Sequence, residues 1–343
     1  MPKHLLTAVA SVAALTFGWG ASALAGTHTY FKDKTITIVV PSGPGGTFMI
    51  YCQLVASNLG RHIPTKPKLI VQNRTGAGGV KSLRWMVSAA PRDGSVIAMI
   101  NPGTTMTPLL RPKMGYDATK LQWLGAPSVR TYTLGVWHKT PIKNIDDAKK
   151  QVVTLASTGK TAASTTLPKL LNNLIGTKFK VITGYKGGGA MNLAVERGEV
   201  WGRTNYYSGY LGVRPDWIRD KKIVFLATIG PPRPEVKDVP RMRDMVKPGI
   251  DRQMIDLLES NFNVGQAFYV PPGVPKARVN MLRKSFTAML KDPLFHAEAK
   301  KRRVPTITRT WQQVEAAVKI GYASPKHVAE KLATLLGFRK NKK

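Results

Sequence analysis

The chain is poor in cysteine and histidine, and each shortage argues against one structural feature. A single cysteine, Cys52, in 343 residues cannot form a disulfide within the chain. Its place in an apolar helical pattern predicts a buried thiol. The six histidines, at positions 4, 28, 62, 138, 296 and 327, lie far apart and lack metal-ligand spacing. We therefore expect neither a disulfide framework nor a metal site.

Patterns typical of catalysis and of nucleotide binding are also missing. No Gly-x-Ser-x-Gly motif occurs, and no glycine-rich segment holds a pair of carboxylates. A dinucleotide fingerprint starting at Gly43 would need glycine at Phe48. The tripeptide at 159–161 reads GKT, but a P-loop would need glycine at Thr154. These gaps argue against hydrolytic and acid–base chemistry, and predict a protein that is not an enzyme and uses no cofactor.

Acidic residues are scarce. Asp and Glu number 19 against 52 Lys and Arg, which gives a formal net charge of +33. Such an excess suits nucleic acid, a membrane surface or an acidic substrate. The basic residues are spread along the chain, with modest clusters only at 300–303 and 339–343, whereas a nucleic-acid-binding arm is denser and interleaved with aromatics. We expect a solvated basic surface that attracts anions, and no nucleic-acid partner.

Long apolar runs are confined to the beginning of the chain. Lys3 and His4 precede an apolar stretch over 5–19, and small residues at Ala23 and Ala25 follow it. This order is typical of a secretory signal peptide, and it predicts removal of residues 1–25 by cleavage after Ala25. No later segment reaches the ~18 uninterrupted apolar residues of a membrane span. We expect an exported, soluble protein.

Short apolar runs alternate with segments of helical period. Tyr51, Leu54, Val55 and Leu59 repeat at helical spacing, and a last long helical pattern covers 311–336. This alternation predicts an α/β fold with parallel sheets covered on both faces. The runs expected to form strands are 35–40, 69–73, 95–100, 152–157, 179–183, 222–228 and 266–270.

Five glycine-rich loops follow predicted strands directly. They are 42–46, 73–79, 101–103, 157–161 and 185–189. In open α/β sheets, ligands bind at the carboxyl ends of the strands. Each loop also opens a helical segment, whose free N–H groups and positive dipole end attract an anion. Glycine lets those N–H groups come close to a ligand. The loops therefore predict a cleft in which main-chain amides hold an anion.

The order of these motifs resembles one known family. The segments VVPSGPGGTF, VQNRTGAGGV, APRDGSVIAMI, ASTGKTAAS, TGYKGGGAMNLAVERGEVWGR and AFYVPPGVPKARVNMLRKSF follow one another over residues 34–310. The succession is similar to that of the periplasmic receptors of tripartite tricarboxylate transporters, the Bug family. Each motif alone is weak, and their order carries the resemblance.

The resemblance implies a fold and a function. The fold is that of a type II periplasmic binding protein, with two α/β lobes that close on a ligand in the cleft between them. Lobe 1 is then discontinuous, over 26–128 and 228–343, and lobe 2 covers 129–227. The implied function is capture of a small organic carboxylate in the periplasm by a monomer, and its delivery to membrane permease subunits or to a sensor kinase.

The resemblance also implies a set of ligand-binding residues. They lie in two loops of lobe 1 and one loop of lobe 2, and are Ser42, Gly43, Gly45, Gly46, Thr47, Phe48, Thr75, Gly76, Ala77, Gly78, Ser157, Thr158, Gly159 and Ser164. Arg203, which follows a short strand expected at 200–202, is a further candidate: its guanidinium could pair with a carboxylate, or be a structural group satisfied by carbonyls.

One position departs from the family pattern. Many relatives carry an aspartate just after the double glycine, where this chain has Met49 and no acid over 47–50. Together with Lys160 and Lys186 in the loops, this favours a purely anionic or aromatic carboxylate over an amino acid. Two other classes stay open: a secreted basic α/β enzyme acting on an acidic substrate, and a surface protein that binds polyanions.

Overall fold

The computed structural model describes residues 29–111, 113–160 and 162–339. The predicted signal peptide lies outside this part of the chain. Eleven strands form two sheets in the described residues. The first sheet has the order β11-β4-β10-β3-β1-β2. Its strands are β1 (Thr35–Val40), β2 (Lys68–Asn73), β3 (Val96–Met99), β4 (Gln122–Ala126), β10 (Phe268–Val270) and β11 (Arg309–Thr310).

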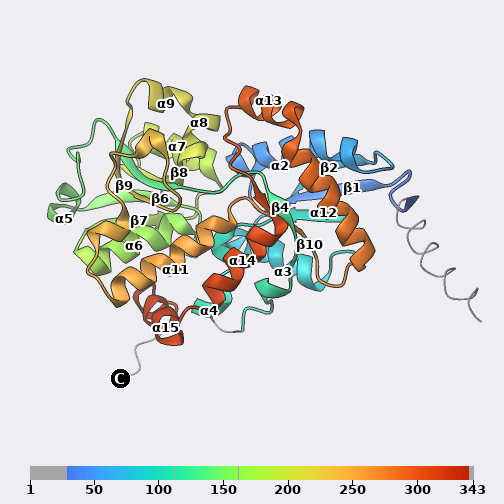
Figure 1. Ribbon diagram of the computed structural model, residues 1–343. Coiled ribbons are helices and arrows are strands. Elements are labelled where there is room, and N and C mark those ends of the chain that lie inside the picture. Colours follow the sequence, from blue (N-terminus) through green and yellow to red (C-terminus); the bar gives the residue numbers. More distant parts are fainter. Residues whose placement is uncertain (1–28, 112, 161, 340–343) are drawn as a thin grey trace, which may run out of the picture.

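The second sheet has the order β7-β6-β8-β5-β9. Its strands are β5 (Tyr132–Trp137), β6 (Val153–Ser157), β7 (Phe179–Thr183), β8 (Gly202–Tyr206) and β9 (Ile223–Ile229). In Figure 1 this sheet lies to the left and the first sheet to the right. Residues 127–131 connect β4 with β5 and thus link the two halves. The lobe boundaries stay a prediction, and β9 extends two residues past 227, the predicted end of lobe 2.

Helices cover both faces of each sheet (Figure 1). The α-helices are α2 (Thr47–Leu59), α3 (Val80–Ser88), α4 (Thr107–Leu110), α5 (Asp147–Lys150), α6 (Ala163–Ile175), α7 (Gly188–Glu196), α8 (Tyr207–Val213), α9 (Pro215–Arg219), α10 (Met242–Met245), α11 (Ile250–Val264), α12 (Lys276–Lys291), α13 (Pro293–Lys301), α14 (Trp311–Tyr322) and α15 (Lys326–Leu335). The 3₁₀-helices are η1 (Gly60–His62), η2 (Ala77–Gly79), η3 (Pro102–Thr104), η4 (Ala118–Lys120) and η5 (Pro234–Val236).

The alternation of side chains along the strands builds the cores. On β1, Ile36, Ile38 and Val40 face α2, α12 and α13, while Val39 faces the opposite side, toward α3 and α14. The second sheet is packed by α6, α11 and α15 on one face and by α7, α8 and α9 on the other. The C-terminal helix α15 therefore lies against α6 of the second half.

Three sequence expectations are wrong in part. The sheets are mixed, because β10 runs antiparallel to β3 and β4, and β5 runs antiparallel to β8 and β9. The helical pattern over 311–336 is divided into α14 and α15 at Pro325. Proline lacks an N–H and disfavours helical backbone in the residue before it. The strand predicted over 266–270 is shorter in the structure, where it is β10. The strands predicted over 35–40 and 179–183 are confirmed as β1 and β7.

Candidate functional site

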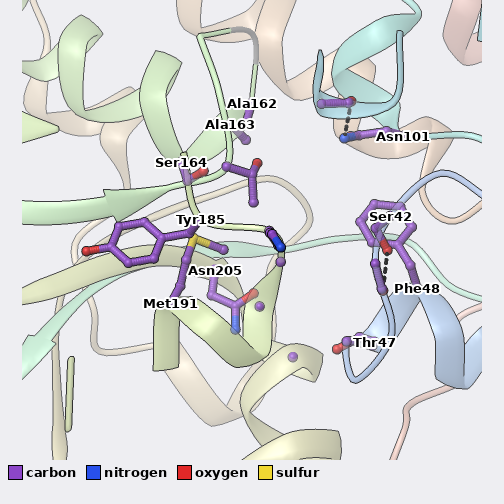
Figure 2. Close-up of a pocket in the computed structure, with 18 of the residues that line it drawn as sticks. Ser42, Thr47, Phe48, Asn101, Ala162, Ala163, Ser164, Tyr185, Met191 and Asn205 are labelled. Atoms are coloured by element: carbon purple, nitrogen blue, oxygen red, sulfur yellow. Dashed lines mark hydrogen bonds between the residues drawn. The ribbon is translucent and has the colours of Figure 1, made fainter. Parts of the chain in front are cut away.

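The five glycine-rich loops meet at one cavity of about 490 Å³ between the two halves (Figure 2). Each loop contributes to its lining, for example through Ser42, Gly76, Asn101, Thr158 and Lys186. Figure 2 shows the segment that bears Ser42, Thr47 and Phe48 on one side, and Tyr185, Met191 and Asn205 on the other. The loops come together because they follow the carboxyl ends of strands in both sheets.

Most of the predicted ligand-binding residues line this cavity. Gly45, Ser157 and Gly159 are not part of the lining, and Lys160 is exposed outside it. The residues of the predicted set in the lining are Ser42, Gly43, Gly46, Thr47, Phe48, Thr75, Gly76, Ala77, Gly78, Thr158, Ser164 and Arg203. The placement describes geometry, and the binding role of these residues stays a prediction.

Four helices begin at the cavity loops without a capping side chain. The N-cap residues of α2, α3, α6 and α7 are Gly46, Gly79, Ala162 and Gly187, and none of them makes a side-chain cap hydrogen bond. None of these four helices has an acid in its first turn, whereas α9, α10 and α11 each have one. First-turn N–H groups and the positive dipole ends are thus left without the negative side chain that often compensates them.

The second loop depends on glycine for its backbone. Gly76, Ala77, Gly78 and Gly79 have φ angles of 130°, 48°, 65° and 97°. Four successive positive φ angles are costly for residues that carry a Cβ, so three of the four are glycine. Asn101 of the third loop donates a hydrogen bond from Nδ2 to the carbonyl of Gly78 at 2.7 Å and holds the loop in place.

The rim of the cavity is closed by backbone from both halves. A Cβ on Gly43 would lie 3.2 Å from the carbonyl oxygen of Lys186, and one on Gly159 would lie 4.0 Å from the nitrogen of Gly78. Loops that come this close leave no space for larger side chains. The structure therefore has the two halves in contact across the rim.

A cluster of hydroxyl groups supports the fourth loop. The Oγ of Ser157 lies 2.8 Å from the Oγ of Ser164 and 2.6 Å from the Oγ1 of Thr165, and Thr165 donates to the carbonyl of Gly159 at 2.8 Å. Ser157 is fully buried behind the wall, while Ser164 reaches the cavity. Both serines were predicted to bind the ligand. Ser157 does not reach the cavity and instead holds Ser164 in place.

Arg203 is the charged residue of the wall that lies deepest. It is 4% exposed, and its Nη1 donates to the carbonyl of Gly188 and to Oδ1 of Asn192, each at 2.7 Å. Its Nε has no acceptor, and no carboxylate among the described residues forms an ion pair with it. Burial lowers the pKa of the guanidinium from its ordinary value, the direction expected when a charge loses water. A structural arginine satisfied by carbonyls was one of the two roles expected for Arg203. That role accounts for the hydrogen bonds of Nη1 but not for Nε.

Several lining residues were missed by the sequence analysis. They include Tyr132, Tyr185, Met191, Asn192 and Asn205. Tyr132 lies on β5, which was not predicted, and Asn205 lies on β8, which begins at Gly202, where the sequence led us to expect a strand to end. Tyr185 belongs to the fifth loop, and Met191 and Asn192 lie on α7, which follows that loop. The polar sequence GRTNY hid this strand, although all five of its residues are buried.

Aromatic side chains of the lining contact one another. The rings of Phe48 and Tyr206 meet edge to face, with their centroids 6.2 Å apart, and Tyr206 meets Tyr132 in the same way at 5.6 Å. Phe48 comes from the first half and the two tyrosines from the second. The three rings therefore form an aromatic contact between the halves.

The lining of the cavity carries no acidic side chain in the described part of the chain. Among the described residues of the lining none is Asp or Glu, while Lys186 and Arg203 are positive. In the sequence, residues 34–92 and 148–195, which carry four of the five loops, also lack any acid. The positions of Asp and Glu in the sequence are sufficient to find this pattern. The lack of acids makes both walls of the cavity electropositive.

A metal-binding cluster and a membrane-spanning helix are both absent from the described part of the chain. No group of three or more His, Cys, Asp or Glu residues is arranged for a metal ion in the ranges 29–111, 113–160 and 162–339. None of the helices in those ranges has the length and apolar character required to cross a bilayer. Cys52 is a buried free thiol, as predicted, and burial raises its pKa.

Comparison with known proteins gives a family match over most of the chain. The model of the tripartite tricarboxylate transporter family receptor matches residues 53–333. A UPF0065 protein of Bordetella bronchiseptica is 24% identical over 268 residues, which are 77% of this chain and 75% of that protein.

Solved structures show the same fold. Periplasmic binding protein BugD superposes with a TM-score of 0.71 at 23% identity, covering 89% of this chain and 98% of that chain. MatC from Rhodopseudomonas palustris, solved with bound malate, gives 0.68 at 20% identity, covering 86% and 99%. A further R. palustris protein, Rpa4515 with adipate, gives 0.66 at 20% identity, covering 87% and 97%. The prediction of a two-lobed periplasmic binding fold is confirmed.

Proposed function

The chain belongs to the receptor family of tripartite tricarboxylate transporters, and from that premise we propose that it captures a small organic carboxylate in the cavity between its lobes. The family is one of solute receptors, so the protein binds its ligand without chemical change. The observation that supports a carboxylate is the lining itself: uncapped helix N-termini and a buried guanidinium surround a space without a carboxylate among its described residues.

The binding roles divide between the lobes. Main-chain N–H groups of the loops at 42–48 and 75–78 hold one carboxylate of the ligand. Thr158, Ser164 and Arg203 contact the ligand from the other lobe, with Ser157 holding Ser164 in place. Charge-assisted hydrogen bonds of this kind contribute about 1.5–3 kcal/mol each. Because both lobes contact the ligand, the bound ligand stabilises the closed arrangement of the lobes.

The class of ligand follows from the missing acid after the double glycine. Met49 packs against the core of the first sheet, and no acid lies in the first turn of α2. A ligand amino group would therefore find no partner there. Two of the related structures are described with malate and with adipate. We infer that this protein also takes a carboxylate without an amino group.

The cellular setting completes the proposal. The chain is exported after cleavage behind Ala25, acts in the periplasm as a monomer and delivers its ligand to the permease subunits of a tripartite transporter, with a sensor kinase as a further partner. Intact mass of the protein recovered from the periplasm tests the cleavage site, since cleavage elsewhere shifts the mass.

A thermal-shift screen tests the binding function. A ligand at a hundred times its Kd stabilises the folded state by about 2.7 kcal/mol. We expect malate, adipate or another member of a carboxylate set to raise the melting temperature, and the corresponding neutral amides to leave it unchanged. Confirmation comes from calorimetric titration of the best compound. A complete absence of stabilisation by carboxylates would contradict the proposal.

A further inference from the structure

Arg130 is a fully buried cation without an anionic partner. It lies in the connection between β4 and β5, its side chain is 0% exposed, and its Nε and Nη2 atoms have no hydrogen-bond acceptor among the described residues. Its Nη1 reaches only the hydroxyl of Tyr132, at 3.5 Å. None of the ion pairs formed by the described residues includes it. The guanidinium is therefore buried as an uncompensated charge.

The guanidinium packs against two aromatic rings, one from each lobe, that also contact each other. Its Cζ is 4.3 Å from the ring centroid of Phe48, on α2 of the first lobe, and 4.8 Å from that of Tyr206, on β8 of the second. Both rings line the cavity, whereas Arg130 does not. Figure 2 shows Phe48 at one wall of the cavity. Arg130 thus lies one aromatic ring away from the proposed ligand position.

Such a group is expensive for the protein to keep. A guanidinium that is taken out of water loses the hydration of its charge, and no carboxylate in the described residues replaces it at Arg130. Contacts with ring faces return only a part of that cost. Arg203 adds a second buried positive charge to the same region, and like charges raise one another's energy. A negative charge in the cavity would offset both.

We propose that Arg130 is a positioning residue that makes binding depend on ligand charge, acting on the anion through Phe48 and Tyr206 and not by contact. This inference rests on the proposed function, because it assumes that an anion occupies the cavity. The two rings belong to different lobes, so the guanidinium contacts both of them only when the lobes are together. An entering anion therefore lowers the energy of the same arrangement of the lobes in which Arg130 contacts both rings.

A purely structural arginine would behave differently. Its removal would lower stability and weaken every ligand by one common factor. A charge-sensing arginine would instead weaken a dianion more than a monoanion of the same shape. Adipate and adipamate, which has one carboxylate replaced by a neutral amide, are matched probes for this difference.

The experiment measures the Kd of both probes by calorimetry for the wild type, Arg130→Met, Arg130→Lys and Arg219→Met. Arg219 is a suitable control because its side chain is 76% exposed and pairs with Asp220. We expect Arg130→Met to lower the preference for adipate over adipamate on the order of tenfold, as for one unit charge at short range in a protein interior. Arg130→Lys retains most of the preference, and Arg219→Met leaves it unchanged.

The outcomes separate the two proposals. Equal weakening of both probes by Arg130→Met, or an unchanged preference, overturns the role of Arg130 and leaves the receptor function intact. A wild type that binds neither these probes nor any other carboxylate contradicts both proposals. Should Arg130→Met fail to fold, as judged by circular dichroism, Arg130→Gln replaces it as the uncharged variant.

Discussion

At the scale of single residues, function depends on charges and glycines that the fold places at one cavity. Arg203 contacts the cavity directly, and Arg130 lies behind it. Both guanidinium groups are buried without a carboxylate partner among the described residues, an arrangement that a protein retains only where something external compensates it. Glycines at the rim such as Gly43 carry no side chain, which lets the backbones of the two lobes come close to each other.

The first prediction at this scale concerns Arg203. We expect Arg203→Met to weaken binding of a carboxylate ten- to a hundredfold, the loss of about 1.5–3 kcal/mol for a hydrogen bond to a charged group. Calorimetric titration measures it, with Arg197→Met as a control because Arg197 is exposed and outside the lining. An unchanged Kd would remove Arg203 from the site.

The second prediction concerns Gly43. A methyl group there would lie 3.2 Å from the carbonyl oxygen of Lys186, so Gly43→Ala should hinder contact between the lobes. We expect a smaller decrease in radius of gyration on ligand addition, as measured by small-angle X-ray scattering, and a higher Kd. Gly187→Ala is the matched variant, because a Cβ at Gly187 would meet nothing within 4 Å and its φ of 169° suits any residue. If both variants close alike, steric contact at Gly43 does not control closure.

At the scale of elements, the beginnings of four helices supply the N–H groups of the site. Helices α2, α3, α6 and α7 begin at the cavity without side-chain caps, whereas α14, remote from the lining, has a complete capping box from Thr310 and Gln313. In α13, Asp292 caps the helix by accepting from the N–H of Leu294 at 2.8 Å. These two helices carry their own acceptors, whereas others outside the cavity, such as α11 and α12, do not. The uncapped helices differ in place: those at the cavity direct their free N–H groups to a position that a ligand can occupy.

Asp292 gives a pH-dependent prediction. The side chain of Arg61, the N–H of Leu294 and His62 lower the pKa of its carboxyl to about 2. Because the pKa is lowered in the folded state, the stabilisation is present above the ordinary value near 4 and is lost as the pH falls toward 2. Asp292→Asn should therefore melt at a lower temperature than the wild type at neutral pH, and the gap should narrow below pH 4 in calorimetric scans. A gap independent of pH would show that the charge is not responsible.

At the scale of the whole molecule, the charge of +33 is not distributed evenly along the chain. The acid-free segments 34–92 and 148–195 form most of the two cavity walls, one from each lobe. The acids of the remaining chain are used largely in ion pairs, such as Arg243 with Asp256 and Arg283 with Glu315. The net positive potential should therefore be strongest where an anion enters.

This distribution predicts salt-dependent capture. Screening shortens the range of electrostatic attraction from about 30 Å at 0.01 M salt to about 8 Å at 0.15 M. We expect the association rate of the ligand, measured by stopped-flow fluorescence, to fall severalfold over this range, with a much smaller change in the dissociation rate. An association rate that does not respond to salt would contradict electrostatic steering.

Local pattern was sufficient for much of this protein. Alternation of apolar runs and helical periods predicted the α/β class, and the ends of β1 and β7 were predicted to the residue, because short-range hydrophobic periodicity specifies such elements. The succession of glycine loops identified the family and the segments that line the cavity, since glycine marks backbone that must approach a ligand.

Long-range packing decided the rest. The polar strand β8 is buried through contacts with β5 and β6, and neither the antiparallel pairings nor the place of α15 beside α6 follows from local periodicity. Arg130, an ordinary arginine in a connecting segment, becomes an uncompensated charge only because Phe48 and Tyr206, 82 and 76 residues away in the chain, enclose it. Burial and the lack of a partner are properties of the assembled fold, and no short stretch of sequence contains them.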